Sequence, residues 1–134
     1  MLINKTEIRV RYGETDQMGI VNNAVYPSWF EIGRSELFRE IGLPYSKMEE
    51  EGIMLPLSEL QVKYKHPARY EEMLTITTSL EEMPLVRTTF KYIIHNSLGE
   101  LVAEGSTTHA FLDATTRRPG RIPEKLKERL EKMF

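Results

Sequence analysis

The segment between residues 24 and 41 constrains the fold most, because it has the period of a helix and is apolar around much of its circumference. Its length corresponds to roughly 27 Å of helix at about 1.5 Å per residue. A surface helix needs a single apolar stripe, so a helix of this kind needs cover on more than one side. We therefore expect it to form the core. Its larger apolar side chains recur at spacings of three, four and seven residues, namely Tyr26, Phe30, Leu37, Phe38 and Ile41, with Trp29 and Gly33 completing the stripe.

Both ends of this helix carry recognisable signals. Pro27 must lie in the first turn, where its missing N–H removes no intrahelical hydrogen bond. Asn22 and Asn23 supply cap chemistry just before it, and we expect Asn23 to be the cap. Gly42 followed by Pro44 ends the helix.

The rest of the chain alternates between apolar and polar residues, as strands with one buried face do. Short connections between the later strands favour antiparallel neighbours, because a parallel pair needs a long crossover. The sequence therefore predicts an α+β fold in which a five-stranded antiparallel sheet wraps around a long central helix, with residues 1–134 forming one domain. The expected strands are 6–12, 55–65, 74–80, 86–95 and 101–112, and a short amphipathic helix is expected at 123–133.

Composition excludes several classes of function. The 18 Lys and Arg residues against 20 Asp and Glu give a net charge of -2, so we expect no nucleic-acid partner. The chain has no Cys, which excludes disulfides and thiol chemistry and suits a reducing compartment, so we expect a cytoplasmic protein. No apolar run is long enough to span a membrane, and the start lacks the apolar core of a signal peptide. His66, His95 and His109 are too far apart to suggest a metal site, and we interpret the last two as structural strand residues.

The segment from Tyr12 to Arg34, YGETDQMGIVNNAVYPSWFEIGR, is where chemistry is expected. Asp16 lies seven residues before Asn23, at the predicted helix start. The free N–H groups and the dipole at such an end form a site for an oxygen that becomes negative during a reaction. We expect Asp16 to be partly buried there, against Met18, Val21 and Tyr26.

This segment strongly resembles the hotdog-fold acyl-CoA thioesterases of the 4-hydroxybenzoyl-CoA thioesterase type. The residues that carry the resemblance are Arg9–Tyr12, Glu14–Val21, Tyr26, Trp29–Glu31 and Arg34, followed by Pro67–Tyr70, Arg118–Pro119 and Ile122–Pro123. The resemblance therefore extends over nearly the whole chain.

The resemblance implies hydrolysis of an acyl-CoA or related acyl thioester, with no metal or cofactor, at a site formed between two subunits of a dimer or dimer of dimers. Asp16 matches the catalytic carboxylate, and the backbone N–H near Asn23 matches the group that polarises the thioester carbonyl. Many members have His where this chain has Asn23, and an amide cannot shuttle a proton. Asp16 could activate water or attack the thioester itself, and the sequence leaves both routes open.

The resemblance and the charge of the substrate point to further residues in substrate binding. Gly19, Val21 and Tyr26 belong to the matching motif, and His66 is a candidate for the substrate entry. The nucleotide phosphates and pantetheine arm need positive charge, for which the candidates are Arg87, Lys91, Arg117 and Arg118, with Arg121 in the same loop.

Three alternatives stay open. Glu31 is a second candidate carboxylate, although we expect it to pair with Arg34 or with a partner chain. A hydratase or dehydratase on the same scaffold is one rival function, but it typically needs a His that the segment from Tyr12 to Arg34 lacks. A non-catalytic acyl-CoA binding module is the other, because a fold alone does not establish catalysis.

Overall fold

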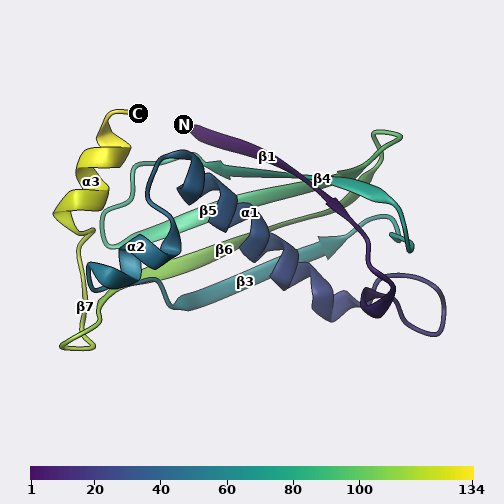
Figure 1. Cartoon of the computed structure of the whole chain (residues 1–134), viewed down its shortest axis with the longest axis horizontal. Coiled ribbons are helices and arrows are strands. Elements are labelled where there is room, and N and C mark those ends of the chain that lie inside the picture. Colours follow the sequence, from purple (N-terminus) through teal and green to yellow (C-terminus); the bar gives the residue numbers. More distant parts are fainter.

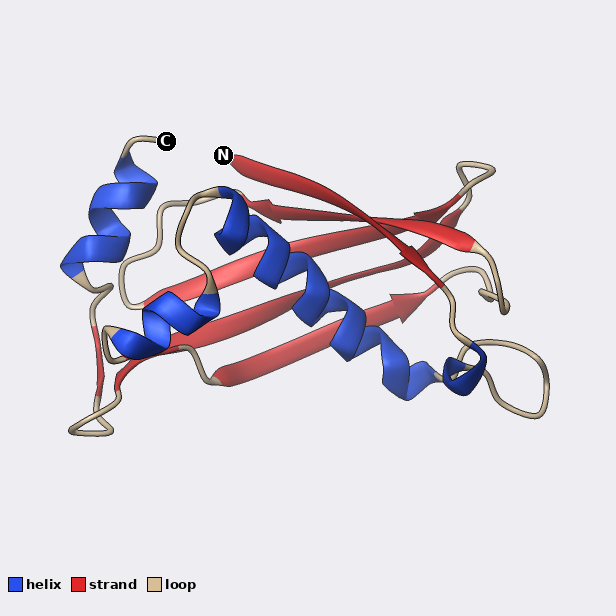
Figure 2. Cartoon of the chain, in the orientation of Figure 1, coloured by secondary structure: helices blue, strands red, loops and turns tan.

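The computed structural model describes the whole chain, Met1–Phe134, and consists of an antiparallel sheet with one long helix lying across it (Figures 1 and 2). The long strands lie in the order β1-β4-β5-β6-β3, and every pairing is antiparallel. The two short strands, β2 and β7, pair with the C-terminal end of β6. The strand bounds are β1 Leu2–Arg9, β2 Ile53–Met54, β3 Leu57–Tyr64, β4 Met73–Leu80, β5 Arg87–Asn96, β6 Leu101–Asp113 and β7 Pro119–Gly120.

The long helix α1 (Tyr26–Glu40) is the centre of the core, as the sequence predicts. A 3₁₀ turn, η2 (Asn23–Val25), leads into it, and Pro27 lies in its first turn. Trp29, Phe30 and Phe38 are almost completely buried, and the Phe30 ring stacks on Tyr92 of β5 with 4.2 Å between centroids. Apolar side chains of the sheet therefore cover the helix along most of its length.

Two glycines allow α1 to approach the sheet closely. A Cβ at Gly33 would overlap the Oγ1 of Thr78 on β4, and a Cβ at Gly105 on β6 would meet the Phe30 ring at 2.8 Å. A larger residue at either position would force the helix and sheet apart. The close packing of layers thus depends on these two positions.

Two short helices complete the chain, α2 (Tyr45–Glu50) and α3 (Glu124–Glu131), and a 3₁₀ turn, η1 (Tyr12–Glu14), follows β1. The loop between β1 and α1 lies at one end of the sheet, whereas α2, α3 and β7 lie at the other (Figure 1). This separation matters for the site, because the sequence analysis predicts functional residues in segments at both ends of the sheet.

The structure confirms the predicted fold but shifts some elements. The first strand runs over Leu2–Arg9 rather than 6–12, because it pairs with β4 along its whole length and the chain then turns into η1. Tyr12, the last residue of the expected strand, instead begins η1 and is 76% exposed. The sequence analysis missed α2, β2 and β7. No helix is long and apolar enough to cross a membrane.

Candidate active site

The loop between β1 and α1 is clamped at its base and closed by a tight turn. Thr15 bridges to Val21, and Ile20 bridges to Arg69 of the loop that precedes β4. The Val21 N–H donates to the Ala68 carbonyl at 2.8 Å. These backbone contacts hold both arms of the loop against the end of the sheet.

Asp16 lies at the tip of this loop. Its Oδ1 accepts the Met18 N–H at 2.8 Å, its carbonyl accepts the Gly19 N–H at 3.0 Å, and its own N–H donates to the Ile20 carbonyl. Gly19 has a φ of +78°, which suits a glycine. One carboxylate oxygen thus holds the turn, while Oδ2 makes no hydrogen bond within the chain.

The expected burial of Asp16 is wrong for the single chain. Asp16 is exposed, and Met18, expected to cover it, is 77% exposed. Val21 and Tyr26 are buried at 3% each, but they face the core. Burial raises the pKa of Tyr26 to about 12, with smaller effects from Tyr64 and Glu72. Any cover for Asp16 therefore has to come from a second chain or from the substrate.

Asn22, rather than Asn23, caps the helical segment. The Asn22 Oδ1 accepts the Ala24 N–H at 2.9 Å, which leaves the Asn23 N–H as the first free donor at the helical end. Asn23 is exposed, and its carbonyl accepts the Tyr64 hydroxyl at 3.1 Å. The residue whose backbone was expected to polarise a carbonyl is thus exposed, and its backbone N–H is left free at the helical end.

Glu14 is a buried carboxylate that the sequence analysis did not single out. It accepts the Arg11 backbone N–H at 2.8 Å and the Trp29 indole N–H at 2.9 Å. Burial alone would raise the pKa of Glu14, but these hydrogen bonds and the nearby Arg11 charge outweigh burial and hold the pKa below its ordinary value of 4.5. Because Trp29 lies in α1, Glu14 ties the Asp16 loop to the helix. The spacing between Glu14 and Trp29 gave no signal of this contact.

The other predicted binding residues lie in three separate places. His66 is exposed near β3, with its Nδ1 3.8 Å from a Glu100 carboxylate oxygen. Arg87 and Lys91 lie on the face of β5 turned away from α1, and Lys91 pairs with Glu81 at 2.9 Å. Neither group lies with Asp16 in the same loop.

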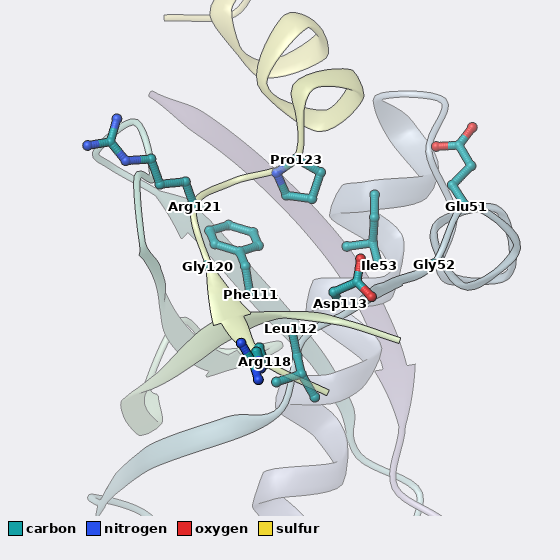
Figure 3. Close-up of a pocket in the computed structure, with 10 residues that line it drawn as sticks. All are labelled: Glu51, Gly52, Ile53, Phe111, Leu112, Asp113, Arg118, Gly120, Arg121 and Pro123. Atoms are coloured by element: carbon teal, nitrogen blue, oxygen red, sulfur yellow. The ribbon is translucent and has the colours of Figure 1, made fainter. Parts of the chain in front are cut away.

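Arg117 and Arg118 lie between β6 and β7, at the end of the sheet opposite Asp16 (Figure 1). Asp113 Oδ1 accepts two backbone N–H groups in this turn, and Arg117 takes a φ of +60°. Arg118 and Arg121 line a cavity of about 250 Å³ together with Phe111, Asp113 and Glu51 (Figure 3). Within one chain, these arginines are therefore remote from the candidate catalytic loop.

Within the chain Arg34 does not pair with Glu31, which leaves a partner chain as the other expected partner of Glu31. The Arg34 Nε donates to the Tyr45 hydroxyl at 3.3 Å and its Nη1 to the Tyr92 hydroxyl at 3.0 Å, and no carboxylate lies within ion-pair distance. Glu31 is exposed. A half-buried cation is thus held by neutral hydroxyl groups.

The hydrogen bonds of Arg34 continue to His109, and in each of them the donor and the acceptor can be assigned. Burial, reinforced by the Arg34 charge, lowers the pKa of His109 to about 4, so the ring is neutral near pH 7. The Leu55 carbonyl, 3.1 Å from Nδ1, can only accept, so Nδ1 carries the proton and Nε2 must accept the Thr107 hydroxyl at 3.0 Å. Tyr92, 2.6 Å from Thr107, must then donate to it. Arg34 thereby fixes the Leu55 carbonyl through three intervening side chains.

A sheet of long antiparallel strands with one long helix across it defines the hotdog class of fold. No group of three or more metal-ligating side chains lies together in the structure. The sequence model that describes the Thioesterase-like superfamily matches residues 10–130 of this chain. The chain therefore belongs to this superfamily, and its class is that of the thioester hydrolases, as the resemblance indicated.

Individual relatives agree with this assignment. The "Putative acyl-CoA thioesterase YneP" of Bacillus subtilis is 39% identical over 119 residues, covering 89% of this chain and 86% of its own. The acyl-acyl carrier protein thioesterase ATL2 of Arabidopsis thaliana is 32% identical, covering 92% of this chain and 66% of its own. The crystal structure of the DHNA-CoA thioesterase from Staphylococcus aureus is 34% identical, with a TM-score of 0.92 over 99% of this chain and 91% of its own.

Proposed function

We propose that this protein hydrolyses an acyl-CoA thioester to a carboxylic acid and free CoA, with Asp16 as the catalytic residue. The observation that carries the proposal is the loop geometry, in which Asp16 keeps one carboxylate oxygen free while the Asn23 N–H is an open donor at the start of the helical segment. Membership of the Thioesterase-like superfamily supports the reaction class. The names of relatives such as YneP support a CoA ester as the substrate.

The chemistry needs one carboxylate and one oxyanion donor. Asp16 Oδ2 either takes a proton from water as water attacks the thioester carbon, or attacks that carbon itself to give a mixed anhydride that water then cleaves. In both routes the carbonyl oxygen becomes negative and accepts the Asn23 N–H. Collapse of this tetrahedral intermediate breaks the C–S bond, and CoA leaves as the thiolate; in the second route this is the step that forms the anhydride, before water cleaves it.

We further propose that the active enzyme is an oligomer built through the edge of β3. This strand pairs only with β6, so its other edge presents free backbone donors and acceptors. Leu57, Leu60 and Tyr64 pair with inward-facing positions of β6, yet they are 51%, 40% and 47% exposed. Antiparallel pairing with β3 of a second copy would continue the sheet and cover these apolar side chains.

The oligomer also accounts for the exposure of Asp16. The Tyr64 hydroxyl donates to the Asn23 carbonyl, so the end of β3 lies against the catalytic end of α1. A second copy docked along β3 would therefore cover the loop that carries Asp16. It would also bring its own Arg117 and Arg118 toward that loop, where they are candidates for contacts with the CoA phosphates.

The experiment is a thiol-release assay of purified protein with octanoyl-CoA. The Asp16→Asn variant keeps an acceptor for the Met18 N–H and should fold normally, but it should lose about 10²- to 10⁴-fold in kcat. Glu7→Gln, an exposed carboxylate on β1 without a hydrogen bond, is the matched control and should be fully active. Wild-type rates in the Asp16→Asn variant would refute the proposal, as would hydration of an enoyl-CoA without any thiol release.

A further inference from the structure

Glu14 contacts all three segments whose relative position matters for the proposed reaction. It lies two residues before Asp16, on the arm of the loop that carries the carboxylate. Its backbone carbonyl accepts the Asn22 N–H of the opposite arm at 2.9 Å. Its side chain accepts the indole N–H of Trp29, in the first turn of α1, at 2.9 Å. One residue thus connects both arms of the loop to the helix.

The bond to Asn22 acts on the oxyanion side of the site. Asn22 caps the helical segment and immediately precedes Asn23, whose N–H is the proposed oxyanion donor. The Asn23 N–H lies in the plane of the peptide unit that joins these two residues, so the position of Asn22 determines where the donor points. Because Glu14 holds the Asn22 N–H, a displacement of Glu14 would move the oxyanion donor relative to Asp16.

The Glu14 carboxylate is fully occupied by donors of the chain itself. Oε1 accepts the Arg11 backbone N–H at 2.8 Å, and Oε2 accepts the Trp29 indole N–H and, at 3.3 Å, the Arg11 Nη2. The side chain is only 8% exposed. A shielded carboxylate whose two oxygens already accept hydrogen bonds is suited to hold the loop rather than to react with the substrate.

Glu72 makes the same local turn as Glu14 but lacks the link to the helix. Its Oε1 accepts the Arg69 N–H at 2.9 Å, and its own N–H donates to the Arg69 carbonyl at 3.2 Å. Glu14 makes the two equivalent bonds with Arg11, at 2.8 and 3.0 Å. The Glu72 side chain makes no other hydrogen bond, so the bond to Trp29 is what distinguishes Glu14 from a residue that only closes a turn.

We propose that Glu14 is a positioning residue of the reaction, which holds the Asp16 carboxylate and the Asn23 N–H at their working separation through its bonds to Trp29 and Asn22. The proposal rests on the proposed function. A displacement of about 1 Å between reacting groups can cost about 10²-fold in rate. Loss of the Trp29 bond should therefore lower kcat about 10- to 100-fold and leave KM nearly unchanged, because the contacts that bind the rest of the substrate are not altered.

The first test makes one substitution in both turns. Glu14→Gln keeps the side-chain length but has a single acceptor oxygen, so it cannot satisfy both the Arg11 and the Trp29 N–H groups. Glu72→Gln keeps the one oxygen that Arg69 needs and is the matched control. In thiol-release assays with octanoyl-CoA, well below the melting temperature of each protein, Glu14→Gln should lower kcat about 10- to 100-fold, whereas Glu72→Gln should match the wild type. A residue that only stabilises the fold would lower the melting temperature and leave kcat unchanged.

The second test asks whether Glu14 acts through Trp29. Trp29→Phe keeps a buried aromatic ring but removes the indole N–H, so it necessarily lacks the bond, and it should lower kcat in the same range. Since both substitutions remove one shared bond, the double variant should lose no more than the larger of the two single losses. A wild-type kcat in Trp29→Phe, or single losses that multiply in the double variant, would overturn the proposal.

A spectroscopic measurement follows the bond without any substrate. Trp29 is the only tryptophan of the chain, so its near-ultraviolet circular dichroism reports on its surroundings alone. The tryptophan band should change in Glu14→Gln and stay as in the wild type in Glu72→Gln. An altered band together with a wild-type kcat in Glu14→Gln would refute the positioning role.

The Asp16→Asn variant distinguishes the failure of this proposal from the failure of the proposed function. If Asp16→Asn hydrolyses octanoyl-CoA at the wild-type rate, the proposed function is wrong, and the positioning role fails with it. If Asp16→Asn is inactive while Glu14→Gln and Trp29→Phe both keep the wild-type kcat, the proposed function stands and only the role of Glu14 is refuted.

Discussion

His109 makes the stability of this protein depend on pH in a way that can be calculated. Its ordinary pKa is 6.5, and burial together with the Arg34 charge lowers it to about 4 in the fold. Between these two pKa values His109 is protonated in the unfolded chain but neutral in the folded chain. The contribution of His109 to the free energy of unfolding is therefore complete above pH 6.5 and is lost as the pH falls toward 4. The full difference corresponds to about 3 kcal/mol, and the part lost between pH 7 and pH 5 is about 2 kcal/mol.

The matched variant is His109→Gln, which does not titrate but retains a donor for the Leu55 carbonyl and an acceptor for the Thr107 hydroxyl. Urea unfolding at pH 7 and pH 5, at one fixed protein concentration, gives the free energy of unfolding for each protein. The wild type should lose about 2 kcal/mol more than the variant over this interval. Carboxylates titrate in both proteins and cancel in the comparison. Equal losses in the two proteins would refute the neutral, buried His109 and the direction of the hydrogen-bonded network.

Three further perturbations follow from the packing. Gly33→Ala should destabilise the fold by about 1 to 3 kcal/mol, because the new methyl group meets Thr78, and this outweighs the higher helix propensity of Ala. A rise in melting temperature would contradict the close approach of α1 to the sheet. Glu14→Leu should cost about 1.5 to 3 kcal/mol and lower kcat, since it frees the Asp16 loop from Trp29, and unchanged stability and rate would argue against that anchor. Leu60→Lys on the β3 edge should shift sedimentation toward the monomer and reduce hydrolysis in parallel, whereas a fully active monomer would rule out an interface-built site.

The main elements of the fold could be predicted from the sequence because each is long enough to show a period. The alternation along β5 and the apolar spacing along α1 each extend over ten or more residues. The elements that were missed, α2, β2 and β7, have six, two and two residues, too few for a pattern to emerge. The positions of β2 and β7 depend on pairing with the end of β6, a contact between segments distant in the sequence.

The candidate site was predictable only where local sequence determines it. Asp16 in its turn and the open backbone at Asn23 follow from short-range hydrogen bonds. The choice of Asn22 as the cap depends on a single turn of 3₁₀ helix that shifts the start by one residue. The links from Glu14 to Trp29 and from Arg34 to Tyr92 join residues 15 and 58 positions apart, and no local pattern encodes such pairs.

The most direct test of the account is a crystal structure of the Asp16→Asn variant with octanoyl-CoA bound. We expect the thioester carbonyl oxygen to lie about 3 Å from the Asn23 nitrogen, with the side chain at position 16 beside the carbonyl carbon. A thioester bound away from the start of α1, with no contact to position 16 or to Asn23, would contradict the account.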